Sequence, residues 1–208
     1  MPQIIVTQNN QGIILAVENR AVQLDDAGKE ISFQMNRLIP LTTYSAFVSA
    51  GAPEGIEMGN ALKRFIQEER LGDIQDIYSA TLAFLSTEYE RFMRKKCELL
   101  PIDPIHHISF ILAGKTDRDP TMPFRLYYLW TKKRLPQLDG DEISYAFSFP
   151  RRIGLEFQLN KMAKGNASLK EIFERVKKGM DQLKEQGEIS LPLSFATITQ
   201  EGFRSQNP

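Results

Sequence analysis

The hydrophobic pattern of the chain changes period several times, and each change predicts a different element. Apolar and polar residues first form two strand-like stretches, 3–8 and 12–18, joined by Asn9-Asn10-Gln11-Gly12, whose residue types are typical of a tight turn. This pattern predicts a β-hairpin in the first twenty residues. Shorter apolar stretches predict further strands at Ile31–Phe33, Arg37–Leu41 and Thr43–Ser49.

Two stretches in the first half repeat apolar residues every three or four positions, the period of an amphipathic helix. The first covers residues 55–70 and ends at Leu71-Gly72-Asp73. The second begins at Ile74, keeps its helical spacing for about five turns and ends before Pro101. The sequence therefore predicts two consecutive helices.

The second half repeats this order of strands followed by helices. A helix is predicted from Pro150 to about Ala163, and a second follows Ser168, which forms a capping box with Glu171. The polar tail 204–208 is expected to be flexible. Strands are predicted at Ile108–Ala113, Phe124–Trp130, Glu142–Phe149 and Leu193–Thr199.

The order is thus strands, two helices, strands, two helices and a strand. Each pair of amphipathic helices needs a sheet face to cover, so the pattern predicts an α+β protein of four layers, with helices outside and two sheets inside. We expect residues 1–203 to form one domain.

Composition excludes several classes of function. The net charge is zero, which argues against binding nucleic acid by neutralising phosphates. No apolar stretch approaches the roughly 20 residues of a membrane span, and nothing at the N-terminus resembles a signal peptide. We therefore expect a cytoplasmic protein that binds neither nucleic acid nor membranes.

No cofactor or metal site is predicted. Cys97 is the only cysteine. His106 and His107 are adjacent, so on a strand they would point to opposite faces and could not easily bind one metal ion together. The acidic stretch Asp139-Gly140-Asp141-Glu142 lacks the ligand spacing of a calcium loop and is interpreted as a turn.

Several short stretches, in order along the chain, resemble proteasome β-type subunits, which have the N-terminal-nucleophile (Ntn) hydrolase fold. The resemblance extends from about residue 3 to residue 203. It implies the four-layer αββα sandwich of that family. The stretches are Gly12–Ala21, Ser49-Ala50-Gly51, Ile111–Gly114, Phe149–Gly154 and Ala196–Gly202.

The resemblance also implies where the family's chemistry would lie. The family uses an N-terminal threonine, whose own amine serves as base. Counting back from Gly12 places Pro2 at that position, and proline has no hydroxyl. The family's aspartate at the end of the second strand corresponds to Glu18. Pro2 and Glu18 are thus the two candidate site residues, as remnants of a catalytic site.

The supporting residues of the family have also changed. The lysine of the third strand falls in Lys29-Glu30-Ile31, where Glu30 or Ile31 fits better, so we expect that role to be lost. The serine before the third helix corresponds to Phe147, with Ser148 one residue away. The supporting aspartate and serine before the last strand fall near Gln186 and Ile189.

Glu18 and Arg20 have two interpretations. They could form a polar cluster at a former active site. As alternate residues of a strand they could equally be a surface ion pair, worth about 0–1 kcal/mol, and we favour this second interpretation.

Three functions remain open. The first, which we favour, is a non-catalytic proteasome-β-like protein that forms a homo-oligomer, for instance a ring. The second is a threonine-peptidase-like amide hydrolase that uses Pro2 as a terminal amine, or Thr7 after processing. The third is a module that binds a peptide or small molecule in the former active-site cleft. Large apolar residues that could form subunit contacts, unless they belong to the core, are Met58, Phe65, Phe84, Phe92 and Phe157.

Overall fold

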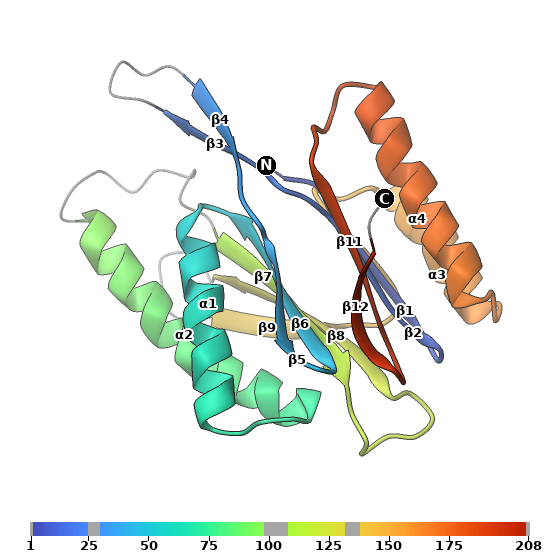
Figure 1. The fold of residues 1–208 in the computed structure, drawn as a ribbon, viewed down its shortest axis with the longest axis horizontal. Helices are drawn as coiled ribbons and strands as arrows, with labels where there is room; N and C mark the ends of the chain where they lie inside the picture. The colour runs from blue at the N-terminus through green and yellow to red at the C-terminus, as the bar shows by residue number, and fades with distance from the viewer. Residues whose placement is uncertain (1, 25–29, 98–107, 132–137, 207–208) are drawn as a thin grey trace.

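The computed structural model describes residues 2–24, 30–97, 108–131 and 138–206. These residues form two five-stranded antiparallel sheets, a separate two-stranded hairpin and four helices (Figure 1). The hairpin pairs β3 (Arg20–Leu24) with β4 (Glu30–Gln34). The chain is thus an α+β protein, as the pattern of the sequence predicts.

The first sheet has the strand order β10-β1-β2-β11-β12. Its bounds are β10 (Ala146–Phe149), β1 (Ile4–Asn9), β2 (Gly12–Glu18), β11 (Leu193–Thr199) and β12 (Gly202–Gln206). The second sheet has the order β5-β6-β7-β8-β9. Its bounds are β5 (Leu38–Thr42), β6 (Ser45–Gly51), β7 (Ile108–Lys115), β8 (Phe124–Thr131) and β9 (Leu138–Ile143).

The helices cover the outer face of each sheet. Helices α1 (Glu54–Glu68) and α2 (Ile74–Cys97) pack on the second sheet, around Phe47, Phe110 and Leu129. Helices α3 (Ile153–Lys164) and α4 (Leu169–Glu185) pack on the first sheet. A third apolar cluster joins the facing sides of the two sheets. The layers are therefore helices, sheet, sheet and helices (Figure 1).

The first hairpin forms as predicted, and its turn shows why. Asn9 pairs with Gly12, and the Asn9 side-chain oxygen accepts hydrogen bonds from the amides of Gln11 (2.9 Å) and Gly12 (3.2 Å). A side chain at position 12 would approach the Ile198 carbonyl oxygen to 2.5 Å, so the turn requires glycine there. The short polar side chain and the glycine thus set the turn and its register.

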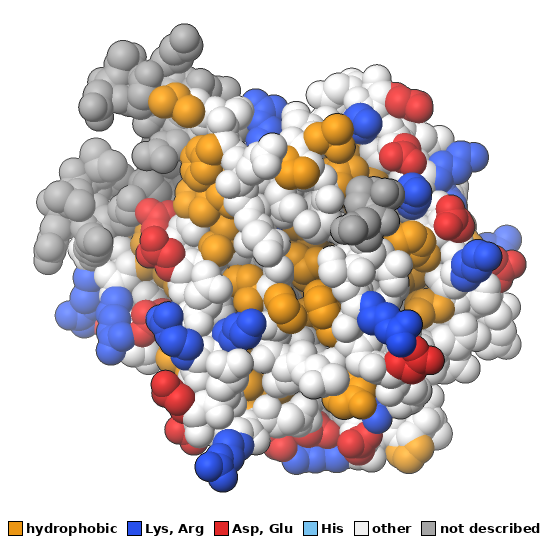
Figure 2. Space-filling view, viewed as in Figure 1, with side chains coloured by type: hydrophobic (Ala, Val, Ile, Leu, Met, Phe, Trp, Pro, Cys, Tyr) orange, Lys and Arg blue, Asp and Glu red, His pale blue; other side chains and the backbone are white. Residues whose placement is uncertain are grey.

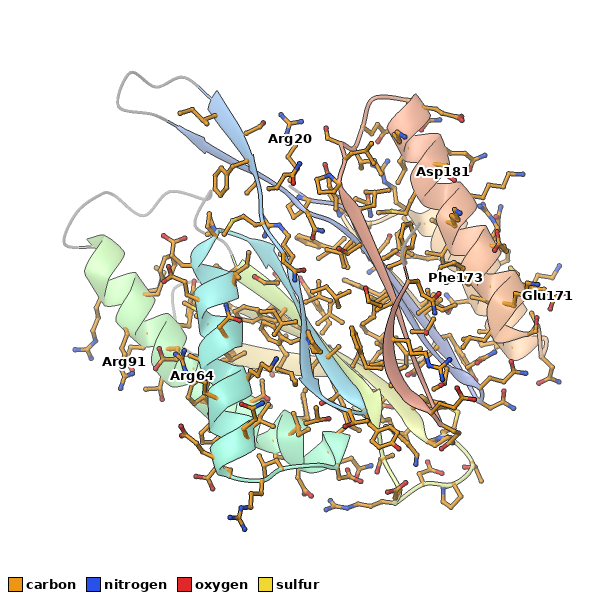
Figure 3. The ribbon with its side chains drawn as sticks, viewed as in Figure 1. Arg20, Arg64, Arg91, Glu171, Phe173 and Asp181 are labelled. Carbon is orange, nitrogen blue, oxygen red and sulfur yellow. The ribbon has the colours of Figure 1, made fainter. Side chains whose placement is uncertain are left out.

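The predicted helices also form, and side chains follow their predicted faces. Ser168 and Glu171 make the reciprocal hydrogen bonds of the capping box at the start of α4. In Figure 3, Arg64 and Arg91 lie on the outward sides of α1 and α2. Phe173 instead points from α4 toward the sheet, where its ring centroid lies 5.8 Å from that of Phe195.

The structure differs from the predicted elements at several points. The stretch Glu142–Phe149 is two strands, because β9 ends at Ile143 and β10 begins at Ala146. Residues 139–142, interpreted above as a turn, lie inside β9. Helix α3 begins at Ile153, three residues after Pro150.

Two strands and most of a third were not predicted. They are β3, most of β9, and β12, which includes Arg204–Gln206 of the expected tail. Their residues are polar or alternate weakly, so pairing with neighbouring strands decides their conformation.

A glycine in α1 lets the helix approach the second sheet. A Cβ at Gly59 would lie 2.7 Å from the Phe47 ring and 2.8 Å from Ile39. We expect Gly59→Ala to lower the free energy of unfolding by about 1–3 kcal/mol, because the added methyl overpacks a close contact. Gly72 is the control, since a Cβ there meets nothing within 4 Å. Urea denaturation of both variants measures the difference, and equal stability would contradict the prediction.

Candidate functional site

The candidate residue Glu18 lies at the end of β2 and is only 4% exposed. One carboxylate oxygen accepts a hydrogen bond from the Gln3 backbone amide (3.0 Å), and the other accepts one from the Ser190 backbone amide (2.8 Å). The Glu18 amide in turn donates to the Gln3 carbonyl (2.9 Å). The carboxylate therefore joins the residue before β1 to the loop before β11.

A buried cation interacts electrostatically with this carboxylate. Arg37, immediately before β5, is 1% exposed, and its Nη1 donates to the carbonyls of Ser49 (3.4 Å) and Gly51 (3.2 Å). Burial lowers the pKa of the Arg37 guanidinium, and the charge of Glu18 partly opposes this by raising it. The Nε atom of Arg37 has no hydrogen-bond partner among the residues that the structure describes.

Arg37, which the sequence did not indicate as a site residue, is thus a buried cation whose charge interacts with that of Glu18. Ile31 is half exposed on β4, and Lys29 lies outside the described residues. The only sequence signal for Arg37 was an isolated charge at the edge of an apolar stretch, a weak one.

Asn19 links the strands around Glu18. Its backbone amide donates to the Pro192 carbonyl (3.0 Å), and its carbonyl accepts from the Met35 amide (2.8 Å). Its side chain accepts from the Arg37 amide (3.3 Å) and donates to Ser194 Oγ (2.6 Å). Asn19 thus holds β2, the residues before β5 and the start of β11 together.

Arg20 does not form a surface pair with Glu18. Its Nε donates to Ser32 Oγ (2.9 Å) and its Nη1 to Ser190 Oγ (3.1 Å), which places it between β4 and the loop before β11 (Figure 3). Ser190 thus contacts both residues, through its amide for Glu18 and its hydroxyl for Arg20. Glu18 and Arg20 are therefore linked through Ser190 and do not form the surface pair that we favoured from the sequence.

The residues before β1 are enclosed in this cluster. Pro2 is buried, and Gln3 is 1% exposed. The Gln3 side chain donates to the Pro150 carbonyl (3.1 Å) and accepts from Arg152 Nε (3.0 Å), while Arg152 forms an ion pair with Glu188 (2.5 Å). The start of β1 is thus fixed from both sides.

Thr7, the other candidate nucleophile, lies inside the first sheet. It is fully buried in β1, where it pairs with Ile14 of β2 and Ala146 of β10. Cleavage before Thr7 would remove half of a strand that has neighbours on both sides. This placement disfavours the processing route.

A second buried carboxylate lies near the start of α3. Glu156 is 5% exposed and accepts hydrogen bonds from Ser148 Oγ (2.6 Å), the Ser148 amide (3.0 Å) and Arg151 Nη2 (2.6 Å). Burial alone would raise the pKa of Glu156, but the hydrogen bonds from Arg151 and Ser148 outweigh it and lower the pKa. Both the amide and the hydroxyl of Ser148 thus donate to Glu156. The neighbouring Phe147 packs against Tyr128, with 4.7 Å between the ring centroids.

Near the other two expected supporting positions, Gln186 and Ile189, the residue that hydrogen-bonds Glu18 is Ser190, directly after Ile189. Gln186 caps the C-terminus of α4, and Ile189 is a core residue beneath that helix. His106 and His107 lie outside the described residues, as does the side chain of Cys97. Within the described residues, no three His, Cys, Asp or Glu side chains are grouped so that they could hold a metal ion.

Known proteins provide no further assignment. No family model matches the chain, and no curated protein matches its sequence. No helix among the described residues combines the length and apolar character needed to cross a membrane.

Proposed function

We propose that the chain is a proteasome-β-like protein of the Ntn-hydrolase fold that acts as a non-catalytic, assembly-forming scaffold in the cytoplasm. One observation carries this proposal. Each oxygen of Glu18 accepts a hydrogen bond from a backbone amide and the side chain is buried, so the carboxylate has a structural role in linking two segments of the chain. The layers of helices and sheets, together with the sequence resemblance, support the fold assignment.

The arrangement before β1 favours the same conclusion. Proline at position 2 has no hydroxyl, and its side chain is buried beside a Gln3 residue that Glu18, Pro150 and Arg152 hold in place. Acyl transfer by the family's route needs a nucleophilic oxygen and a free amine at one residue. These hydrogen bonds instead link the start of β1 to the end of β2, to the residues before α3 and, through Glu18, to the loop before β11.

An exposed apolar pair on α3 supports assembly. Ile153 is 76% exposed and Phe157 is 70% exposed, and residues four apart lie on the same side of a helix. The buried side of α3 is formed by other residues, namely Glu156, Leu159 and Ala163. Phe157 is thus the one proposed contact residue that is exposed. Of the other proposed contact residues, Met58 and Phe92 are buried. The rings of Phe65 and Phe84 stack on each other, with 4.7 Å between their centroids.

Native mass spectrometry of the untagged chain, together with a peptide-hydrolysis assay, tests this function. We expect a discrete oligomer of chains that retain Pro2, with no turnover. Turnover that is lost in Pro2→Ala would establish the amide hydrolase instead. A monomer at all concentrations would contradict the scaffold.

We expect Phe157→Glu to weaken the oligomer while the single chain still folds, because the side chain is exposed in the single chain. The matched control is Arg64→Glu on α1, an exposed position in the opposite helix layer. Sedimentation velocity of both variants over a concentration series measures the effect. An oligomer unchanged by Phe157→Glu would show that α3 is not part of the contact.

A further inference from the structure

A cleft of about 420 Å³ lies between the edges of the two sheets, next to Asn19. One end of it is closed where the Phe203 amide of β12 donates to the Thr43 carbonyl at the β5–β6 turn (2.7 Å). From there β5 and β12 diverge, as Figure 1 shows, and apolar side chains lie between them on the surface in Figure 2. The volume is within the range of ligand sites, about 300–1,000 Å³.

The lining has a distinct chemistry, because none of the residues that form it is charged. Met35, Leu38 and Pro40 supply an apolar wall, and Asn19 and Ser194 supply polar groups. In a chain with 25% charged residues, a cleft of this size without charge favours a neutral ligand.

The opposite wall is a strand edge. β12 is the last strand of the first sheet, and Phe203 and Ser205 line the cleft. In an antiparallel pair, successive residues alternate between bonding to the partner strand and facing away from it. The Phe203 amide bonds to Thr43 and not to β11, so the backbone amide and carbonyl of Phe203 point away from β11. The same holds for Ser205, two residues later. The amide and carbonyl of Ser205 therefore point off the edge.

We infer that this cleft binds an extended, uncharged peptide segment, which adds to β12 as a further strand of the first sheet. Backbone hydrogen bonds to Ser205 hold the peptide, and alternate side chains of the peptide contact Met35, Leu38 and Pro40. Beyond the closed end at Phe203, β12 continues for residues 204–206, so it can pair with about three residues of a peptide, roughly 10 Å at about 3.3 Å per residue. The cleft shares Asn19 with the hydrogen bonds around Glu18, but Glu18 itself does not line it, and the inference does not depend on whether the chain assembles.

The test is an NMR titration of the full chain with a pool of end-blocked pentapeptides made from Ala, Val, Leu, Thr, Ser and Asn. At millimolar peptide we expect shifts of the Asn19, Met35, Phe203 and Ser205 amides. The same pool with alternate backbone amides N-methylated should bind about tenfold more weakly, since it loses one or two backbone hydrogen bonds. A pool that contains Lys and Glu should also bind more weakly.

Two variants separate the backbone from the side chain. Ser205→Pro removes the outward amide, a change that an edge strand tolerates, and should weaken binding about tenfold. Ser205→Ala keeps the amide and should bind normally. Absent shifts, shifts elsewhere, equal binding of the N-methylated pool or equal binding of the two variants would each overturn the inference. Shifts that depend on protein concentration without peptide would assign the edge to a second copy of the chain.

Discussion

Replacing Glu18 by alanine is expected to lower the free energy of unfolding by about 2–5 kcal/mol, because two backbone amides lose their charged acceptor. These are the amides of Gln3 and Ser190, and the substitution also removes a negative charge that interacts with the buried Arg37 cation. Both amides lie where the polypeptide joins separate strands, so the loss also loosens the start of β1. Chemical denaturation of the variant and the unaltered chain measures this difference.

Two further substitutions show how much of this loss comes from charge. Glu18→Gln keeps an acceptor oxygen and should cost less than Glu18→Ala. Combining Glu18→Gln with Arg37→Met removes both charges, so the double variant should be more stable than the sum of the single effects predicts. The control is Glu174→Ala on the exposed side of α4, which should change stability by no more than about 0.5 kcal/mol. Additive effects of the two charge substitutions would contradict a Glu18–Arg37 pair.

Replacing Glu156 by alanine should cost about 2–4 kcal/mol, because it leaves the amide and hydroxyl of the buried Ser148 without their acceptor. Arg151→Ala is the matched control. That side chain is 60% exposed, so its ion pair with Glu156 should contribute about 0–1 kcal/mol. Equal losses for the two variants would show that the exposed pair, and not Ser148, sets the effect.

The pH dependence of stability provides a second measurement on Glu156. Its hydrogen bonds lower the pKa below the ordinary value of 4.5 in the folded state. The unfolded state therefore binds the proton more readily, and the stabilisation is present above pH 4.5 and lost as the pH falls through the folded-state pKa. Glu156→Gln does not titrate, so its stability should fall less steeply over this acidic range. Parallel curves would contradict the assignment.

Local chemistry explains which elements could be predicted from the sequence. The hairpin turn depends on Asn9 and Gly12, three residues apart, and the capping box depends on Ser168 and Glu171, also three apart. The helices are amphipathic, so their apolar spacing identifies them. In contrast, β12 contains a polar sequence whose conformation depends on pairing with β11.

In the candidate site, by contrast, few of the contacts could be predicted from the sequence. The sequence resemblance led to Pro2 and Glu18, and the structure brings both into one region. The sequence could not show that Glu18 accepts hydrogen bonds from the backbone amides of Gln3 and of Ser190, which is 172 residues away. Nor could it identify Arg37, because the carbonyls of Ser49 and Gly51 that surround it belong to another strand.

By itself, the sequence determined the α+β class, the helices and the first hairpin, since these depend on residue types a few positions apart. Only the tertiary structure decided that Glu18 and Arg37 are buried together, that Phe157 is exposed, and that β12 forms an edge beside an uncharged cleft. The reason is physical: burial, charge pairing and sheet edges depend on which distant segments meet, and the hydrophobic period of each segment carries no information about its partners.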